Sequence, residues 1–231
     1  MRLEVLYEDN HVIVCIKPAG VLSQAGSLDL EDMLNLIKSY LKEKYDKPGN
    51  VYLGLVHRLD TNVGGVMVFA KTSKAAKRLS EQLREHDFTK RYLAVVRGKL
   101  PLNQTFVWED YLIKDEVNNK ALVVCEGKGK HSKVSFSVLE NLEINGLDWS
   151  LVNIDLLTGR FHQIRVQFAS RNHQIYNDGK YGETTNGYVL GLYAYEIEFT
   201  HPIKKDVMRY VSLPRTGIFK GFSVIDKGEI L

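Results

Sequence analysis

The chain has 231 residues, of which 44% are hydrophobic and 26% charged, with a formal net charge of +3. These values exclude a disordered or collagen-like chain and indicate a globular protein. The longest apolar run, Val66–Ala70, is far shorter than the roughly 20 residues of a membrane-spanning helix. The acidic start of the chain does not match a signal peptide, and Cys15 and Cys125 lie too far apart in sequence for a disulfide framework. The sequence therefore predicts a reduced, cytoplasmic protein.

Elements follow in chain order from an opening hairpin, formed by Leu3 to Tyr7 and His11 to Ile16. Apolar residues at helical spacing predict one helix from Ser27 to before Pro48, and a second over Thr72 to Glu85. Strands are predicted for the remaining apolar runs: 51–56, 65–70, 92–96, 105–113, 121–125, 133–141, 148–156, 191–200 and 207–213. One more helix is predicted from Gly159 to Ser170.

Few helices and many consecutive strands predict an α+β fold, with a mainly antiparallel mixed sheet and flanking helices. The chain has no linker rich in Gly, Pro or Ser that would divide it. We therefore expect a single domain over residues 1–231.

The basic residues are concentrated in one segment. Lys71 to Lys99 holds nine basic and three acidic residues, a net +6, whereas the remaining 22 basic and 25 acidic residues give −3. Such a run is usually a solvated helix face, and it can also be a surface that contacts phosphates. Composition alone favours the solvated face.

Two segments place charged residues next to strand-like apolar ones, namely 57–65 and 157–165. Asp60 stands at the start of a Thr-Asn-Val-Gly-Gly loop, where a rigid sheet can hold a carboxylate at the mouth of a cleft. With Arg58, Arg160 and Arg165 in these segments, it would remain an anion and could act as a nucleophile or a base. Taken alone, an aspartate before Thr-Asn is more often a turn or capping residue.

The sequence lacks the motifs of the other catalytic chemistries considered. The seven histidines do not fall at metal-site spacings, and the chain has no serine-hydrolase elbow, P-loop or dinucleotide-binding glycine motif. We expect neither a metal nor a cofactor.

Four motifs occur together in order: KPAG at 17–20, HRLD at 57–60, KRYLAVVRG at 90–98 and TGRFHQIR at 158–165. With these motifs the chain resembles the RluA family of pseudouridine synthases, over about Leu6 to Pro214. The resemblance implies a pseudouridine synthase fold with a central RNA-binding cleft, no cofactor, and isomerisation of uridine within ribosomal or transfer RNA. Many relatives carry an N-terminal S4-type RNA-binding domain, and here the hairpin begins within the first residues. We expect a monomer without that domain, bound to RNA and to no membrane.

The resemblance also implies roles for single residues. Asp60 matches the catalytic aspartate, which attacks either the sugar or the base. Arg165 matches the arginine that pairs with it, and Tyr92 matches the active-site tyrosine. Arg58 matches an arginine that fills the gap left by the flipped nucleotide. The other expected substrate-binding residues are His57, Arg160, His162, Gln163, Lys74, Lys77 and Arg78.

Alternatives remain open at this stage. The sequence departs from the family pattern at Val63-Gly64, Gln167, Asn177 and Tyr193. A catalytically silent RNA-binding protein or assembly factor on the same fold is the second hypothesis. A hydrolase that acts on glycosidic bonds is the third, although neither motif supplies an obvious second carboxylate.

Overall fold

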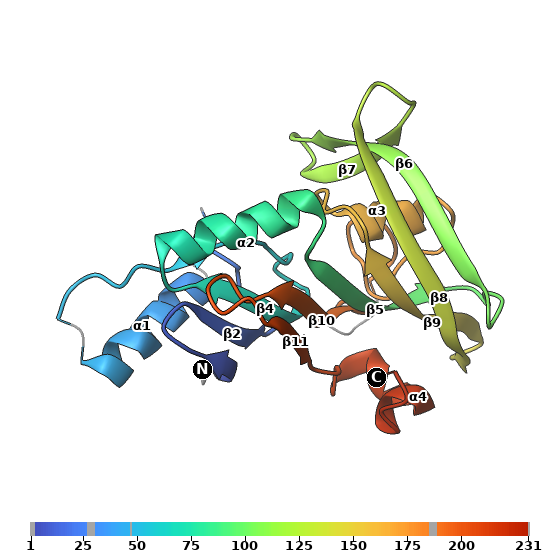
Figure 1. Cartoon of the computed structure of the whole chain (residues 1–231). Coiled ribbons are helices and arrows are strands. Elements are labelled where there is room, and N and C mark those ends of the chain that lie inside the picture. Colours follow the sequence, from blue (N-terminus) through green and yellow to red (C-terminus); the bar gives the residue numbers. More distant parts are fainter. Residues whose placement is uncertain (1–2, 27–30, 47, 185–188, 231) are drawn as a thin grey trace. The chain divides into compact units, whose positions relative to one another are not determined.

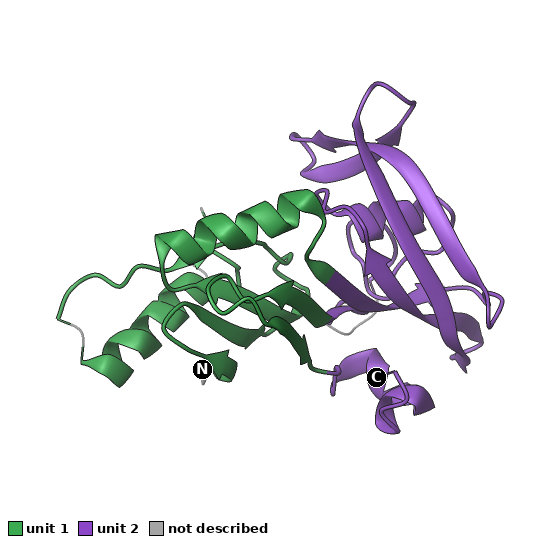
Figure 2. Ribbon diagram, viewed as in Figure 1, with its two compact units in different colours: residues 1–89, 196–212 green, residues 90–195, 213–231 purple. Residues whose placement is uncertain are grey.

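The computed structural model describes residues 3–26, 31–46, 48–184 and 189–230. The chain splits into two compact units (Figure 1, Figure 2). Unit 1 comprises residues 1–89 and 196–212, and unit 2 comprises residues 90–195 and 213–231. No helix in the described ranges is long and apolar enough to cross a membrane. The predicted helix positions Ser27 and Leu30 lie outside the described residues.

Unit 1 contains two helices and a mainly antiparallel set of strands. Its elements are β1 (Glu4–Glu8), β2 (Val12–Lys17), α1 (Met33–Tyr45), β3 (Gly54–Leu55), β4 (Gly64–Ala70), α2 (Ser73–Glu85) and β11 (Val207–Val211). β5 (Thr89–Arg97) begins here and continues in unit 2, and β10 (Leu192–Thr200) begins in unit 2 and ends here. The strands follow the order β1-β2-β4, with β3 also on β4 and β11 on β10, and all of these pairs are antiparallel.

The core of unit 1 follows from strands that are apolar on both faces. β4 is buried along its whole length and pairs with β2 in a register that sets Val14 opposite Val68. Because side chains alternate between faces, these two valines share a face, on which Ala75 and Leu79 of α2 pack. Thr72 caps α2, since its Oγ1 accepts a hydrogen bond from the Ala75 N–H at 3.2 Å.

Unit 2 is a long-stranded antiparallel sheet with short helices. Its elements after β5 are β6 (Thr105–Asp115), β7 (Lys120–Val124), β8 (Lys130–Ile144), β9 (Leu147–Leu156), α3 (Gln163–Ala169), a 3₁₀-helix η1 (Gly217–Gly221) and α4 (Ser223–Asp226). The strand order is β5-β9-β8-β6-β7, and each of these pairs is antiparallel.

The structure corrects three sequence predictions. Of the predicted strand 51–56, only Gly54–Leu55 pairs as a strand. Val51 and Leu53 are buried at alternate positions, as in a strand, but have no strand partner. The predicted helix from Gly159 begins four residues later, since His162 adopts a left-handed φ of 48°. The C-terminal η1 and α4, which bury Phe219 and Ile225, were not predicted.

Candidate functional site

The Asp60 loop in unit 1 is held on both sides of the carboxylate. Leu59 is buried, and its carbonyl accepts from the Ser23 hydroxyl at 2.8 Å while its N–H donates to the same oxygen at 3.1 Å. On the other side, the Thr61 carbonyl accepts from the Gly20 N–H at 2.8 Å. Gly20 has a φ of +89°, a conformation that favours glycine. Half-buried Asp60 therefore sits on a backbone that is fixed by the segment around KPAG.

Lys17 is a buried cation beside this loop. Its ammonium group donates to the carbonyls of Pro18, Val21 and Thr61 at 3.0, 2.6 and 2.9 Å. Burial lowers the pKa of Lys17 to about 7, and the negative charge of Asp60 opposes that shift. The KPAG motif thus contributes a lysine that both ties down the loop and interacts electrostatically with Asp60.

The two residues before Leu59 differ in their surroundings. The Nε2 atom of His57 accepts from the Val68 N–H at 3.1 Å, and its ring lies 5.5 Å from that of Phe88. His57 is therefore anchored to β4, whereas Arg58 is exposed to solvent. Of the two, Arg58 is the one whose exposure suits the predicted contact with a displaced nucleotide.

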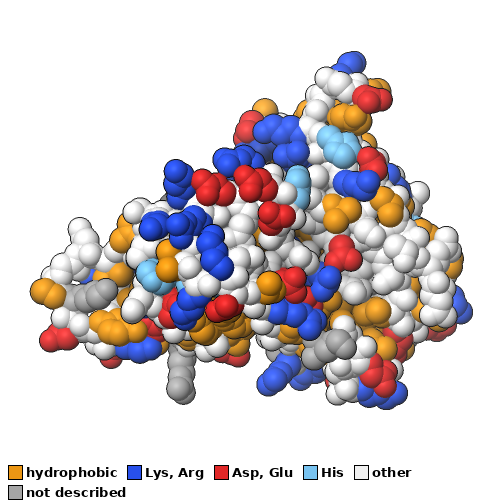
Figure 3. Space-filling model, in the orientation of Figure 1, with side chains coloured by type: hydrophobic (Ala, Val, Ile, Leu, Met, Phe, Trp, Pro, Cys, Tyr) orange, Lys and Arg blue, Asp and Glu red, His pale blue; other side chains and the backbone are white. Residues whose placement is uncertain are grey.

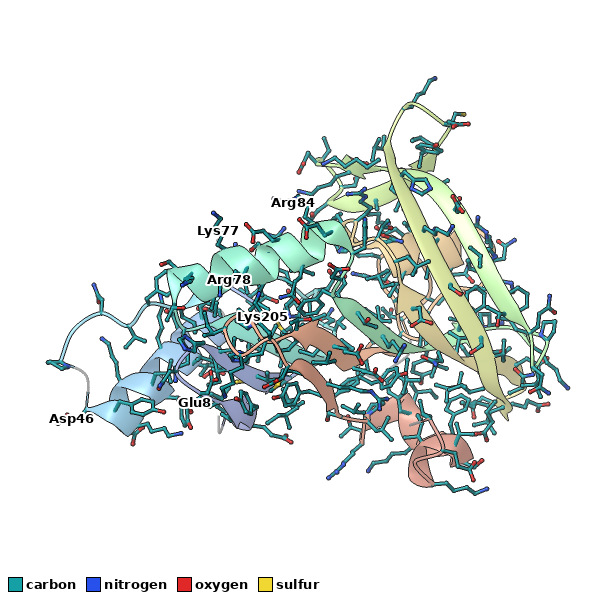
Figure 4. All side chains as sticks on the ribbon, viewed as in Figure 1. Glu8, Asp46, Lys77, Arg78, Arg84 and Lys205 are labelled. Carbon is teal, nitrogen blue, oxygen red and sulfur yellow. The ribbon has the colours of Figure 1, made fainter. Side chains whose placement is uncertain are left out.

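The basic side chains of α2 also differ in their exposure to solvent. Lys74 and Lys77 are exposed, and Lys77 points outward from the helix in Figure 4. Arg78 is only half-exposed, and its Nη1 donates to the Pro202 carbonyl at 2.6 Å, so it joins α2 to the turn between β10 and β11. Figure 3 shows Lys and Arg side chains over α2, with acidic side chains among them.

Arg165 in unit 2 forms a buried ion pair. Its Nε and Nη2 donate to the two carboxylate oxygens of Asp178 at 2.8 and 2.7 Å. The side chain of Asp178 is 0% exposed and that of Arg165 is 7% exposed. A two-point pair of this kind fixes the plane of the guanidinium. No role was predicted for Asp178 from the sequence.

Tyr181 links three parts of unit 2. Its hydroxyl accepts from the Ala121 N–H on β7 at 2.5 Å and lies 2.9 Å from the Nδ1 of His162. Its ring also lies under the guanidinium of Arg165, at 5.3 Å. Tyr181 therefore orients two residues of the TGRFHQIR motif at once.

Gln163 organises the loop that precedes α3. It is 2% exposed, and its amide oxygen accepts from the Thr158 hydroxyl at 2.8 Å and the Arg160 N–H at 3.0 Å. Its amide nitrogen donates to the Lys133 carbonyl at 3.1 Å. The exposed Arg160 is in turn fixed through Nε, which donates to the His131 carbonyl at 2.9 Å. These contacts make Gln163 a support of the loop, in addition to its predicted role towards substrate.

The predicted catalytic residues divide between the units. Asp60 belongs to unit 1, whereas Tyr92 on β5 and Arg165 on α3 belong to unit 2. Tyr92 is 7% exposed. The pairing of Asp60 with Arg165 stays a prediction.

A cavity of about 610 Å³ opens in unit 2 between β7, α3 and residues 179–182. Val166 and Tyr181 line it, but Tyr92 and Arg165 do not, so it is distinct from the predicted catalytic residues of this unit. In the described part of the chain, no three His, Cys, Asp or Glu residues group so as to hold a metal ion. Cys15 and Cys125 are both free thiols.

Comparison with known proteins gives a consistent result. The family model described as RNA pseudouridylate synthase matches residues 11–170. The chain is 33% identical over 226 residues to "Ribosomal large subunit pseudouridine synthase C" of Buchnera aphidicola subsp. Baizongia pistaciae, covering 94% of this chain and 68% of that protein. It is 34% identical over 215 residues to the protein of the same name from Escherichia coli K12, covering 89% and 64%. The chain thus spans about two thirds of the length of these relatives.

Solved structures agree at the level of the fold. "Human RNA Pseudouridylate Synthase Domain Containing 4" superimposes with a TM-score of 0.73 at 22% identity, covering 92% of this chain and 89% of that chain. "Human RNA Pseudouridylate Synthase Domain Containing 1" gives 0.72 at 23% identity, covering 91% and 83%. The predicted fold class is confirmed. Because the family model matches more than half of this chain, the chain belongs to the RNA pseudouridylate synthase family.

Proposed function

We propose that this protein isomerises uridine to pseudouridine in ribosomal RNA. The observation that carries the proposal is the family match over residues 11–170, which contain HRLD and TGRFHQIR complete. Relatives that match most of the chain are named ribosomal large subunit pseudouridine synthases, which favours ribosomal RNA over transfer RNA.

In the proposed reaction, Asp60 attacks the target nucleoside and the bond between N1 and C1′ of uridine breaks. The uracil ring turns, a bond forms between C5 and C1′, and the bond to Asp60 breaks, which restores the carboxylate. C5 gives up its hydrogen while N1 ends protonated. Substrate and product are isomers, so no oxidant, reductant or second substrate is required. Lys17 and Ser23, by fixing the carbonyls on either side of Asp60, limit the motion of the attacking carboxylate.

The other predicted residues serve access and proton transfer. A stacked base does not expose its glycosidic carbon, so the nucleotide must be flipped out, at a cost of a few kcal/mol. Exposed Arg58 has a planar guanidinium that can stack where the base has left. Tyr92 supplies a flat ring for the flipped uracil and helps to move its proton. Arg165 pairs with Asp60, with its guanidinium oriented by Asp178.

The experiment is tritium release from large-subunit ribosomal RNA transcribed with 5-tritiated uridine. Wild type should release tritium, and Asp60→Asn should release none while binding the RNA with nearly unchanged affinity. Asp87→Asn, at an exposed aspartate of the same unit, is the matched control and should retain activity. Release by Asp60→Asn at the wild-type rate would overturn the role of Asp60. RNA binding without release by wild type would favour the silent RNA-binding alternative.

We also propose that the protein is a cytoplasmic monomer. Light scattering coupled to size-exclusion chromatography tests the oligomeric state, for which a mass near 26.4 kDa is expected. A mass of twice that value would contradict it.

A further inference from the structure

The turn between β10 and β11 carries a lysine in a backbone conformation that lysine rarely adopts. Lys205 has a φ of 72°, in the left-handed region that favours glycine. The other eight non-glycine residues with positive φ in the described ranges are all Asn, Asp or His, the types that tolerate this region best. Such strain persists only where the surrounding structure holds it, and it gathers at functional positions. Glycine or asparagine would form this turn at a lower cost, so the lysine side chain has another use.

Hydrogen bonds fix the rest of this turn. The buried His201 accepts at Nδ1 from the N–H groups of Ile203 and Lys204, at 3.2 and 2.8 Å. Its Nε2 lies 3.0 Å from a carboxylate oxygen of Asp9. The Lys205 N–H donates to the His201 carbonyl at 3.0 Å. These bonds set the point from which the Lys205 side chain projects.

The two lysines of the turn differ in their partners. The ammonium group of Lys204 pairs with Asp9 at 3.0 Å and donates to the Tyr7 hydroxyl at 2.9 Å. Lys205 is exposed, and none of the carboxylates in the described ranges forms an ion pair with it. Its charge is therefore available to a partner outside the chain.

The turn lies against the basic helix α2. The Nη1 atom of Arg78 donates to the Pro202 carbonyl at 2.6 Å, so Lys205 lies near Arg78, as Figure 4 shows. The turn and the helix thus present their exposed charges together. Five of these side chains are basic (Lys74, Lys77, Arg84, Lys204, Lys205) and two are acidic (Glu85, Asp206), a net charge of +3.

Exposed cations on a surface of fixed geometry are suited to the phosphates of a nucleic-acid backbone, which position an RNA without reading its sequence. We propose that α2 and the β10–β11 turn form one surface that binds backbone phosphates of the substrate RNA, with Lys205 as a phosphate contact. Arg78 is a positioning residue in this surface, because its guanidinium holds the turn. This inference rests on the function proposed above.

The first test compares Lys205→Gly, which removes the charge and relieves the strain, with Lys205→Arg, which keeps the charge. Lys42→Gln, at an exposed lysine of α1 in the same unit, is the matched control. Affinity for large-subunit ribosomal RNA is measured over a salt series. In Lys205→Gly the slope of log K against log salt should fall by about one, and binding should weaken by up to about tenfold at about 0.1 M salt. Lys205→Arg and Lys42→Gln should keep the wild-type slope.

Two further measurements separate RNA contact from a structural role. The urea midpoint of Lys205→Gly should be unchanged or higher, because glycine adopts a positive φ without strain. In tritium release, Lys205→Gly should raise KM with little change in kcat, since a phosphate contact is present in both ground and transition states.

An unchanged salt slope in Lys205→Gly would overturn the proposal. A lower urea midpoint would also overturn it, because the lysine would then support the fold. A kcat loss with unchanged KM would likewise count against a phosphate contact. A reduced slope in Lys205→Gly, in a protein that releases no tritium, would support the RNA surface and contradict the proposed reaction.

Discussion

Three charged side chains around the candidate site are buried, namely those of Lys17, Arg165 and Asp178. Arg165 and Asp178 satisfy each other by a two-point ion pair, and Lys17 is satisfied by backbone carbonyls. The expected effect of each substitution depends on this difference, because removing one member of a buried pair leaves the other uncompensated.

Asp178→Asn should reduce both stability and activity. It removes a charge that is fully buried against Arg165 and should lower the free energy of unfolding by about 3–5 kcal/mol. Urea denaturation measures this loss. Asp155→Asn is the control, because its pair with Arg91 is 46% and 35% exposed and should contribute less than about 1 kcal/mol. Equal losses in the two variants would show that the buried Asp178 pair contributes no more to the free energy of unfolding than the exposed Asp155 pair.

Glu8 predicts a pH dependence of stability. Burial raises its pKa, but hydrogen bonds from Lys44, Lys71, Tyr45 and Tyr40 more than offset this effect and lower the pKa from 4.5 to about 2. A carboxylate with a lowered pKa stabilises the folded state above its unfolded pKa. This contribution is lost as the pH falls from 4.5 towards 2.

Replacing Glu8 with Gln should therefore flatten the loss of unfolding free energy between pH 4.5 and 2. Glu4→Gln, at an exposed position on the same strand, should leave the wild-type curve unchanged. Thermal or urea unfolding across that range is the measurement. Identical curves for Glu8→Gln and wild type would contradict the assignment.

At the scale of the element, α2 contributes both to the fold and to the proposed RNA contact. One face packs Ala75 and Leu79 into the core. Gln82 is tied to β10, since its amide nitrogen donates to the Thr200 carbonyl and its amide oxygen accepts from the Thr200 N–H, each at 2.8 Å. Arg78 is tied to Pro202, so the exposed lysines are the better candidates for contact with phosphate.

We expect Lys74→Glu combined with Lys77→Glu to weaken RNA binding and to lower its salt slope by about two. The control is Lys38→Glu combined with Lys42→Glu on α1, which makes the same change in net charge on another helix. Affinity measured over a salt series decides between them. Equal salt slopes in the two double variants would show that the lysines of α2 are solvated and do not contact phosphates.

At the scale of the whole molecule, the chain passes between the two compact units three times, and two of these boundaries lie within strands. These two are Thr89/Lys90 in β5 and Tyr195/Glu196 in β10, and the third, Ser212/Leu213, follows β11. A break in either strand would interrupt a regular element. We therefore propose that residues 1–231 unfold cooperatively as one domain.

Both tryptophans, Trp108 and Trp149, belong to unit 2, whereas far-ultraviolet circular dichroism reports on both units. If the chain is one domain, denaturant transitions followed by tryptophan fluorescence and by circular dichroism should coincide. Two separate midpoints would show that the units unfold independently.

The sequence by itself determined the family and most of the strands. Complete motifs carry the resemblance, which the comparisons confirm, and the alternation of apolar residues is a local signal. Local patterns were wrong at Val51 to Val56, where buried side chains alternate without strand pairing, and at Gly159, where a left-handed His162 delays the helix.

Only the tertiary structure decided which partners the charged side chains have. Asp178 and Arg165 are separated by 13 positions, and Lys17 and Thr61 by 44. No spacing rule within one helix or strand links such pairs, because their contact depends on how the chain folds back on itself.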